Sequence, residues 1–337
     1  MPLPSSGQIS FSQLAAELGN ACSNVGLRAY SACANLTSPD SSIELYGKTC
    51  TPVYGAGTWS TGGALITARR YLAGAGSQNE GLASGGFTTV ALSCTEEYNG
   101  TSWSAGGSLI VANYVQESVG TQNIGLVIGG FNGTINLSCT EEYNGTSWSV
   151  GGVLITARRG SASGGVQNEA FVAGGYVNSQ VSCTEEYNGT SWSAGGAMIT
   201  ARFVLAGAGT QNVGLAASGY VTVSVSCTEE YNGTSWSAGG AVIVARANLA
   251  GAGTQNEAII MAGEIPGGSV SSTEEYNGTS WSTGGSLISG RTHIPASGGS
   301  QGAAFLAGGI SSISGVISSV LSCTEEYNKS VTSICLA

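Results

Sequence analysis

The alternation of apolar and polar positions between residues 202 and 240 predicts four short strands in succession. The first two are the small apolar segments LAGAGT and VGLAASG, separated by the turn-forming pair Gln211-Asn212. The third, VSVSCTEEY, alternates with a period of two, which places successive side chains on opposite faces of a strand. Asn232-Gly233 follows as a two-residue hairpin signal, and TSWSAGG supplies the fourth strand.

This unit is repeated along most of the chain. The phrase CTEEYNGTSWS at 183–193 returns unchanged at 94–104, 139–149 and 227–237, and TEEYNGTSWS returns at 273–282. The six tryptophans follow one another at intervals of 44, 45, 44, 44 and 45 residues. A period of this length with four strands per unit, and without amphipathic helical runs, is typical of the blades of a β-propeller.

The repeated residues also resemble the kelch family. Its pattern has an Arg near the start of the blade, a Gly-Gly after the second strand, a Tyr on the third and a Trp on the fourth. Arg158, Gly174-Gly175, Tyr187 and Trp192 match it in one unit, and Arg69, Gly85-Gly86, Tyr98 and Trp103 match it in another. The resemblance implies an all-β, six-bladed kelch-like propeller over residues 58–337.

The first and last units are complementary fragments. The last unit reaches Tyr327 and then lacks a tryptophan, whereas Trp59 has no preceding tyrosine hairpin of its own. We therefore predict that residues 57–64 pair with residues 321–327 and supply the outer strand of the final blade. This pairing removes the open edge that an unclosed arc of six blades would leave.

Residues 1–57 lack the repeat and predict a small helical leader. Ser10 to Gln13 forms a capping-box pattern, Gly19 is a stop signal, and further short helices are expected at 26–34 and between Ser38-Pro39 and Gly47. LPSSGQISFSQLAAELG and the later SSIELYG resemble an N-terminal module of tailed-bacteriophage virion proteins. The resemblance implies a virion protein that is anchored through residues 1–47 to other virion proteins.

Composition and charge argue against several classes of binding protein and of membrane protein. Charged residues make up only 9% of the 337 residues, the net charge is −10, and no basic stripe is present, so we expect neither nucleic-acid binding nor attraction to anionic membranes. We expect no secretory signal peptide and no membrane insertion, because there is no charged segment followed by an apolar one at the start and no apolar run of 18 residues.

Six Glu-Glu pairs hold twelve of the twenty acidic residues. Paired carboxylates suit acid–base catalysis or calcium binding, but catalysis needs one asymmetric site, and here every unit carries the same pair. With a two-residue Asn-Gly turn, Glu185 would lie opposite Trp192 and Glu186 opposite Ser191, so that Glu185 shares a face with Tyr187 and Trp192. The structural residues expected in the blades are Glu96, Tyr98, Trp103, Glu141, Tyr143, Trp148, Glu185, Tyr187, Trp192, Glu229, Tyr231, Trp236, Glu274, Tyr276, Trp281, Glu325, Tyr327 and Trp59.

A ring of cationic residues recurs once per unit, at Arg69, Arg158, Arg202, Arg246 and Arg291, with Asn113 in the remaining unit. Two interpretations stay open. Each Arg could pair with the first Glu of a neighbouring hairpin and brace blade to blade, since a buried Glu needs a partner. Alternatively, the resemblance to kelch proteins implies that these six positions line the mouth of a central channel and bind an acidic ligand.

We expect no metal site and no cofactor. Cys94, Cys139, Cys183, Cys227 and Cys323 share one repeat position, which puts them too far apart for disulfides, and Ser272 replaces them once. The chain has no CxxC and a single histidine, which argues against zinc and against copper-oxidase chemistry. Cys50 and Cys335 could approach each other if the two ends of the chain meet.

The units differ mainly after the second strand, in FTTVALS, FNGTINLS, YVNSQVS, YVTVSVS, EIPGGSVSS and ISSISGVISSVLS. Loops on a rigid scaffold usually carry binding specificity. The sequence therefore favours a non-enzymatic virion protein, a tail- or fibre-type appendage in multiple copies that displays these loops to a host-surface glycan or protein. The alternative is a purely structural neck, tail or capsid-decoration component whose propeller mediates subunit contacts.

Overall fold

The computed structural model describes residues 49–55, 57–313 and 316–336, and every regular element among them is a β-strand. The helical leader predicted for residues 1–57 lies almost wholly outside the described residues. Contacts along the chain separate a propeller, Thr58–Asn328, from a second unit that holds the two ends. The described residues contain no helix of the length and apolarity that a membrane crossing requires.

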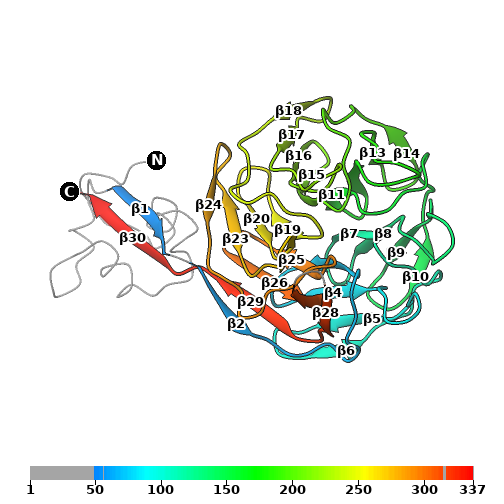
Figure 1. The fold of residues 1–337 in the computed structure, drawn as a ribbon, viewed down its shortest axis with the longest axis horizontal. Coiled ribbons are helices and arrows are strands. Elements are labelled where there is room, and N and C mark those ends of the chain that lie inside the picture. Colours follow the sequence, from blue (N-terminus) through cyan, green and yellow to red (C-terminus); the bar gives the residue numbers. More distant parts are fainter. Residues whose placement is uncertain (1–48, 56, 314–315, 337) are drawn as a thin grey trace, which may run out of the picture. The chain divides into compact units, whose positions relative to one another are not determined.

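The propeller consists of six four-stranded antiparallel sheets arranged around a central axis, as predicted (Figure 1). From the centre outward, blade one is β3 (Ala73–Gly76), β4 (Gly81–Ser84), β5 (Thr95–Tyr98) and β6 (Trp103–Ala105). Blade two is β7 (Glu117–Gly120), β8 (Gly125–Ile128), β9 (Thr140–Tyr143) and β10 (Trp148–Val150). Blade three is β11 (Ala162–Val166), β12 (Glu169–Ala173), β13 (Thr184–Tyr187) and β14 (Trp192–Ala194).

The second half of the ring repeats this order. Blade four is β15 (Ala206–Thr210), β16 (Val213–Ala217), β17 (Thr228–Tyr231) and β18 (Trp236–Ala238). Blade five is β19 (Ala250–Gly253), β20 (Ala258–Met261), β23 (Thr273–Tyr276) and β24 (Trp281–Thr283). Blade six is β25 (Ala296–Gly299), β26 (Ala303–Ala307), β29 (Thr324–Asn328) and β2 (Thr58–Thr61).

The ring closes through blade six, as predicted. β2 pairs antiparallel with β29, and Trp59 lies directly opposite Tyr327. Their ring centroids are 5.0 Å apart, against 4.9 Å for Tyr187 and Trp192 in blade three. The start of the propeller therefore restores the aromatic pair that its last unit lacks.

The outer hairpin has a longer loop than predicted. Tyr187 pairs with Trp192 and Glu186 with Ser193, so four residues form the connection and the expected pairing of Glu185 with Trp192 is wrong. The reason is the Asn188 side chain, whose Oδ1 accepts hydrogen bonds from the N–H groups of Thr190 and Ser191 at 3.0 and 2.9 Å. These bonds stabilise a longer turn in place of the two-residue turn. The predicted faces are unaffected, because Glu185 is two positions from Tyr187 on the same strand.

The inner strands are built from small residues because they approach one another closely. A Cβ on Gly207 would lie 2.4 Å from the backbone nitrogen of Ser163 in the neighbouring blade. A Cβ on Gly74 would similarly lie 2.3 Å from the nitrogen of Ser297. The repeated AGAG and ASGG segments are therefore required by backbone-to-backbone packing around the axis.

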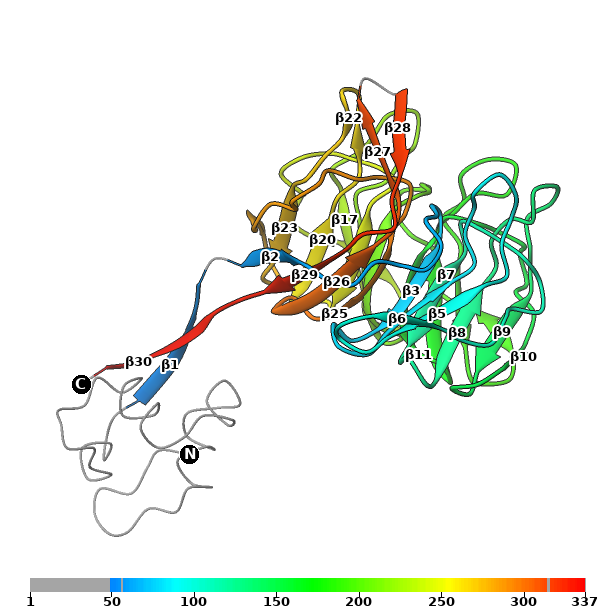
Figure 2. The ribbon, with the colours of Figure 1, turned by 90° about the horizontal axis from the view of Figure 1, so that it is seen from below.

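The loops of blades five and six form an additional sheet in the order β21-β22-β27-β28, which extends from one face of the ring (Figure 2). Its strands are β21 (Glu264–Ile265), β22 (Gly268–Ser269), β27 (Ile310–Ile313) and β28 (Val316–Val320). All five residues of β28 are exposed.

In the second unit, β1 (Thr49–Tyr54) pairs antiparallel with β30 (Val331–Leu336). The register places Cys50 opposite Cys335, so the backbones of these two residues are adjacent in the ladder.

Candidate functional site: an aromatic cup at the mouth of the propeller

The predicted ring of arginines lies inside the protein. Arg202 forms an ion pair with Glu229, and both side chains are almost fully buried, at 0% and 2% exposed. The equivalent pairs are Arg69–Glu96, Arg158–Glu185, Arg246–Glu274 and Arg291–Glu325. A guanidinium without exposed surface cannot meet a ligand unless the blade rearranges, so the brace is the interpretation that the geometry favours.

The Glu that pairs with each Arg does not lie in a neighbouring blade, as a blade-to-blade brace would require, but in the blade that the Arg precedes. Glu229 belongs to the blade that follows Arg202, and its carboxylate also accepts the N–H groups of Ile199 and Thr200, at 2.6 and 3.1 Å. These residues lie in the segment that connects blade three to blade four. The first Glu of each pair therefore fastens the connection between blades to the third strand of the next blade.

Asn113 replaces Arg in blade two and leaves Glu141 without a guanidinium. Glu141 still accepts the N–H groups of Ile110 and Val111, at 2.7 and 2.9 Å. Burial raises the pKa of Glu141, against the opposing effect of these two hydrogen bonds. The carboxylate position is thus used in all six blades even where its cation is missing.

Direct contact between blades comes from the other residues of the repeated phrase. The hydroxyl of Tyr187 donates to Glu142 of blade two at 2.6 Å, so the second Glu of the pair has a structural role that the sequence did not reveal. Trp192 Nε1 donates to Thr140 Oγ1 at 3.0 Å, and both partners are buried. The same Tyr–Glu and Trp–Thr contacts occur around the ring, including Tyr98 with Glu326 and Trp59 with Thr273 across the closure.

A ring of backbone hydrogen bonds encircles the mouth of the central channel. In every blade the residue two positions after the Arg or Asn has a positive φ, from 49° at Val204 to 64° at His293. The N–H of this residue donates to the carbonyl of its equivalent in the preceding blade, at 2.7–3.3 Å, and in blade six the donor is shifted by one residue. The six bonds, donor first, are Tyr71–His293, Val115–Tyr71, Gly160–Val115, Val204–Gly160, Asn248–Val204 and Ile294–Asn248. For Val115 and Val204 this conformation is strained, and strain of this kind persists only where the surroundings hold it in place.

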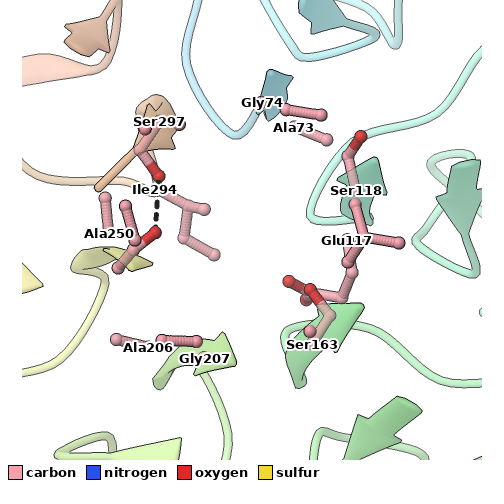
Figure 3. Close-up of a pocket in the computed structure, with 18 of the residues that line it drawn as sticks. Ala73, Gly74, Glu117, Ser118, Ser163, Ala206, Gly207, Ala250, Ile294 and Ser297 are labelled. Atoms are coloured by element: carbon pink, nitrogen blue, oxygen red, sulfur yellow. Dashed lines mark hydrogen bonds between the residues drawn. The ribbon is translucent and has the colours of Figure 1, made fainter. Parts of the chain in front are cut away.

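Beneath this ring, the inner strands enclose a cavity of about 160 Å³ (Figure 3). Its walls are mostly glycine, alanine and serine, and Glu117 of β7 is the only carboxylate among its lining residues. Burial raises the pKa of Glu117 to about 8, while the N–H of Ser161, 2.7 Å from Oε1, opposes the shift. The cavity shares no lining residue with the space above the ring.

Above the ring lies a cup of about 920 Å³ with aromatic walls. Isolated bridges place two side chains of each blade side by side, in the pairs Arg70–Phe87, Tyr114–Phe131, Arg159–Tyr176 and Phe203–Tyr220 for blades one to four. Neighbouring pairs are joined by ring contacts, with centroids 4.8 Å apart for Phe87 and Tyr114 and 5.3 Å apart for Tyr176 and Phe203. Aromatic and arginine side chains therefore form a continuous band over blades one to four, and part of this band lines one side of the cup, through Tyr114, Phe131, Arg159, Phe203 and Tyr220.

On the other side of the cup, the polar residues Asn248 and Glu264 lie among small and apolar ones. Ala247 and Glu264 occupy the paired positions in blade five, and Thr292 and Ile310 occupy them in blade six. Asn248 Nδ2 donates to Glu264 Oε2 at 3.3 Å, and His293 Nε2 lies 4.0 Å from the same oxygen. Burial, together with Arg70, lowers the pKa of His293 to about 4, so this imidazole is neutral at pH 7.

The sequence pointed to the loops of the cup but not to its aromatic wall. Phe87, Phe131, Tyr176 and Tyr220 are the first residues of four variable segments in which specificity was expected, and Glu264 begins a fifth. Four aromatic residues directly after Gly-Gly or Ser-Gly were an available signal. Arg70 and Arg159, which contact the rings of Phe87 and Phe131, directly follow Arg69 and Arg158 of the predicted ring.

No protein-family model matches the chain, and a search of curated proteins found no match. In the part of the chain that the structure describes, no three His, Cys, Asp or Glu residues are grouped as metal ligands would be.

Proposed function

We propose that this chain is a non-enzymatic virion protein of a tailed bacteriophage, a tail- or fibre-type appendage whose kelch-like propeller recognises the host surface. The observation that carries the proposal is the aromatic cup, a concave site with convergent polar groups on one face of a rigid scaffold. The resemblance of residues 1–47 to a phage virion module supports attachment to other virion proteins. The identical Glu pairs in all blades support the absence of catalysis, since each has a structural partner.

A location experiment tests this proposal. An antibody against the propeller should label the assembled particle at a distal, accessible position, and the purified full chain should compete with the particle for adsorption to its host. Removal of residues 1–47 should abolish incorporation into particles while the propeller still folds. Absence of the chain from the particle, or adsorption that the purified chain does not affect, would contradict the proposal.

One observation favours the alternative of a purely structural neck, tail or capsid-decoration component. Each blade exposes an isoleucine at the same repeat position, three residues before the Arg or Asn, and these side chains are 54–63% exposed. The six are Ile66, Ile110, Ile155, Ile199, Ile243 and Ile288. Apolar groups repeated around a ring suit contacts between subunits. Burial of the chain between subunits of the particle, with no effect of the purified chain on adsorption, would support this alternative.

A further inference from the structure

The cup is lined by a cation, Arg159, and on its other side by a carboxylate, Glu264. The protein carries a net charge of −10, and five of its arginines are neutralised by buried glutamates. Among the described residues, Arg70 and Arg159 have no carboxylate within ion-pair distance, and both lie at the aromatic band. The Nε atom of Arg70 is buried without a hydrogen-bond partner. Of these two arginines, Arg159 lines the cup and is therefore the cation that a ligand in the cup would meet.

Arg159 is held in a defined position by aromatic rings. Its guanidinium carbon lies 4.2 Å from the ring centroid of Phe131 and 5.2 Å from that of Tyr176. Contacts on the face of a guanidinium leave the N–H groups in its plane available, and these match the two oxygens of a carboxylate. Arg159 lines the cup and is partly exposed, so a carboxylate can reach it without rearrangement of the blade.

The remaining wall suits a sugar ring. Phe131, Phe203 and Tyr220 line the cup, and none of the three is fully buried. The face of an aromatic ring is negative and attracts the polarised C–H groups of a pyranose. Thr222, Ser224 and Asn248 supply hydroxyl and amide groups along the same cavity, which match the hydroxyls of a sugar.

We propose that the cup binds an acidic glycan, with the carboxylate of a uronic or sialic acid residue on Arg159 and its pyranose ring against the aromatic wall. This inference rests on the proposed role in host-surface recognition and names its ligand class. An acidic peptide satisfies the same charge, but its amide groups do not match the aromatic faces of Phe131, Phe203 and Tyr220, whereas the C–H groups of a pyranose do.

Titration calorimetry with the full chain tests the proposal. The probes are tetragalacturonate and tetrasialic acid, their fully methyl-esterified forms, and tetraglutamate as the acidic peptide. We expect an acidic sugar to bind at least about tenfold more tightly than its neutral ester and than the peptide, since a charge-assisted pair is worth at least that factor. Arg159→Gln should weaken binding by a similar factor, and Phe203→Leu should weaken the acid and the ester together.

Lys329→Gln is the matched control, because it removes the same charge from a residue that does not line the cup. It should leave binding unchanged, and thermal unfolding should show that Arg159→Gln is folded. The proposal is overturned if no acidic sugar binds more tightly than its ester, if tetraglutamate binds best, or if Arg159→Gln binds like the wild type.

Binding of the labelled chain to host cells separates the two proposals. If the wild-type chain binds cells but acidic sugars neither bind nor compete, the ligand class is wrong and host recognition stands. If acidic sugars bind the cup but the chain does not bind host cells, the ligand chemistry stands and host recognition is wrong.

Discussion

At the scale of single residues, the Thr, the two Glu, the Tyr and the Trp of the repeated phrase all have defined structural partners. In blade four, Thr228 accepts a hydrogen bond from Trp281 of the next blade, Glu229 holds Arg202, and Glu230 accepts the hydroxyl of Tyr276. The two carboxylates of a pair act on opposite sides of their strand, the first within the blade and the second between blades. This division of roles gives both residues a structural reason to recur in all six units.

The Arg–Glu pair should behave as a buried brace. Arg202→Met leaves Glu229 buried with only backbone donors, and we expect a loss of about 3–5 kcal/mol in the free energy of unfolding. Glu229→Gln in the same chain should recover part of this loss, so the double variant is more stable than the sum of the single changes implies. Denaturant unfolding measures all three, and a loss below about 1 kcal/mol for Arg202→Met would argue against the brace.

Glu117 should make stability depend on pH. Its pKa is raised to about 8 in the folded protein, above the ordinary value of 4.5, so the unfolded chain releases this proton at lower pH. Stability from this group is therefore complete below about pH 4.5 and falls as the pH rises towards 8. Glu117→Gln keeps an acceptor for Ser161 and removes the titration. Its melting temperature should exceed that of the wild type most at pH 8 and least at pH 4, and equal gains at both values would contradict the assignment.

At the scale of elements, the inner turns connect neighbouring blades. Gln211, in the two-residue turn between β15 and β16, donates to the carbonyls of Ala170 and Tyr187 in blade three, at 3.0 and 2.8 Å. A glutamine at the corresponding turn makes the same two contacts in every blade, through Gln78, Gln122, Gln167, Gln255 and Gln301. The turn signal Gln-Asn thus has a second function, because its first residue satisfies backbone carbonyls of the preceding sheet.

The adjacent residue provides a matched control for this contact. Gln211→Ala leaves two carbonyls without a donor, and we expect it to lower the free energy of unfolding by about 1–3 kcal/mol. Asn212→Ala removes only an exposed hydrogen bond to Glu169, so its effect should stay within about 0.5 kcal/mol. Parallel chemical denaturation of the two variants makes the comparison, and equal losses would contradict the proposed role of Gln211.

The sequence predicted those elements whose signals repeat. Six tryptophans at a constant interval determine the number of blades, and the missing tryptophan after Tyr327 identifies Trp59 as its replacement. The outer loop was predicted too short, because the Asn188 side chain competes locally with the hairpin turn. The aromatic residues of the cup repeat after Gly-Gly or Ser-Gly, but their assembly into one site could not be predicted, since Phe131, Arg159 and Tyr220 come from different units and are brought to one cavity only by the curvature of the ring.

At the scale of the whole molecule, the pairing of β2 with β29 joins the start of the propeller to its end, and we expect stability to depend on it. A disulfide across this closure, from Ser60→Cys and Glu326→Cys, would join two residues that lie opposite each other and are 266 positions apart. The control is Ser193→Cys with Glu186→Cys, the same pair of positions within blade three. Both lose one acceptor for a tyrosine hydroxyl, from Tyr98 and Tyr231 respectively, so the local cost is matched.

The two crosslinks differ mainly in the length of chain that they enclose. The entropy of loop closure predicts that oxidation stabilises the closure variant by about 3 kcal/mol more than the control. Unfolding of the oxidised and reduced forms of both variants measures this difference. Equal stabilisation of the two would mean that separation of β2 from β29 is not the step that opens the ring.

The closure also sets an order of events during translation. β2 leaves the ribosome early, and Glu326, which pairs with Ser60, is synthesised 266 residues later, a delay of about 15–50 s. Throughout this interval the nascent chain holds an outer strand without its own partner, while a sister chain whose ring has not yet closed presents an identical, unpaired β29. When several ribosomes translate one messenger, sister chains lie close together, and this favours exchange of the outer strand between them. The exchange is limited by the time that the intervening blades need to fold and to bring residue 324 next to β2 of the same chain.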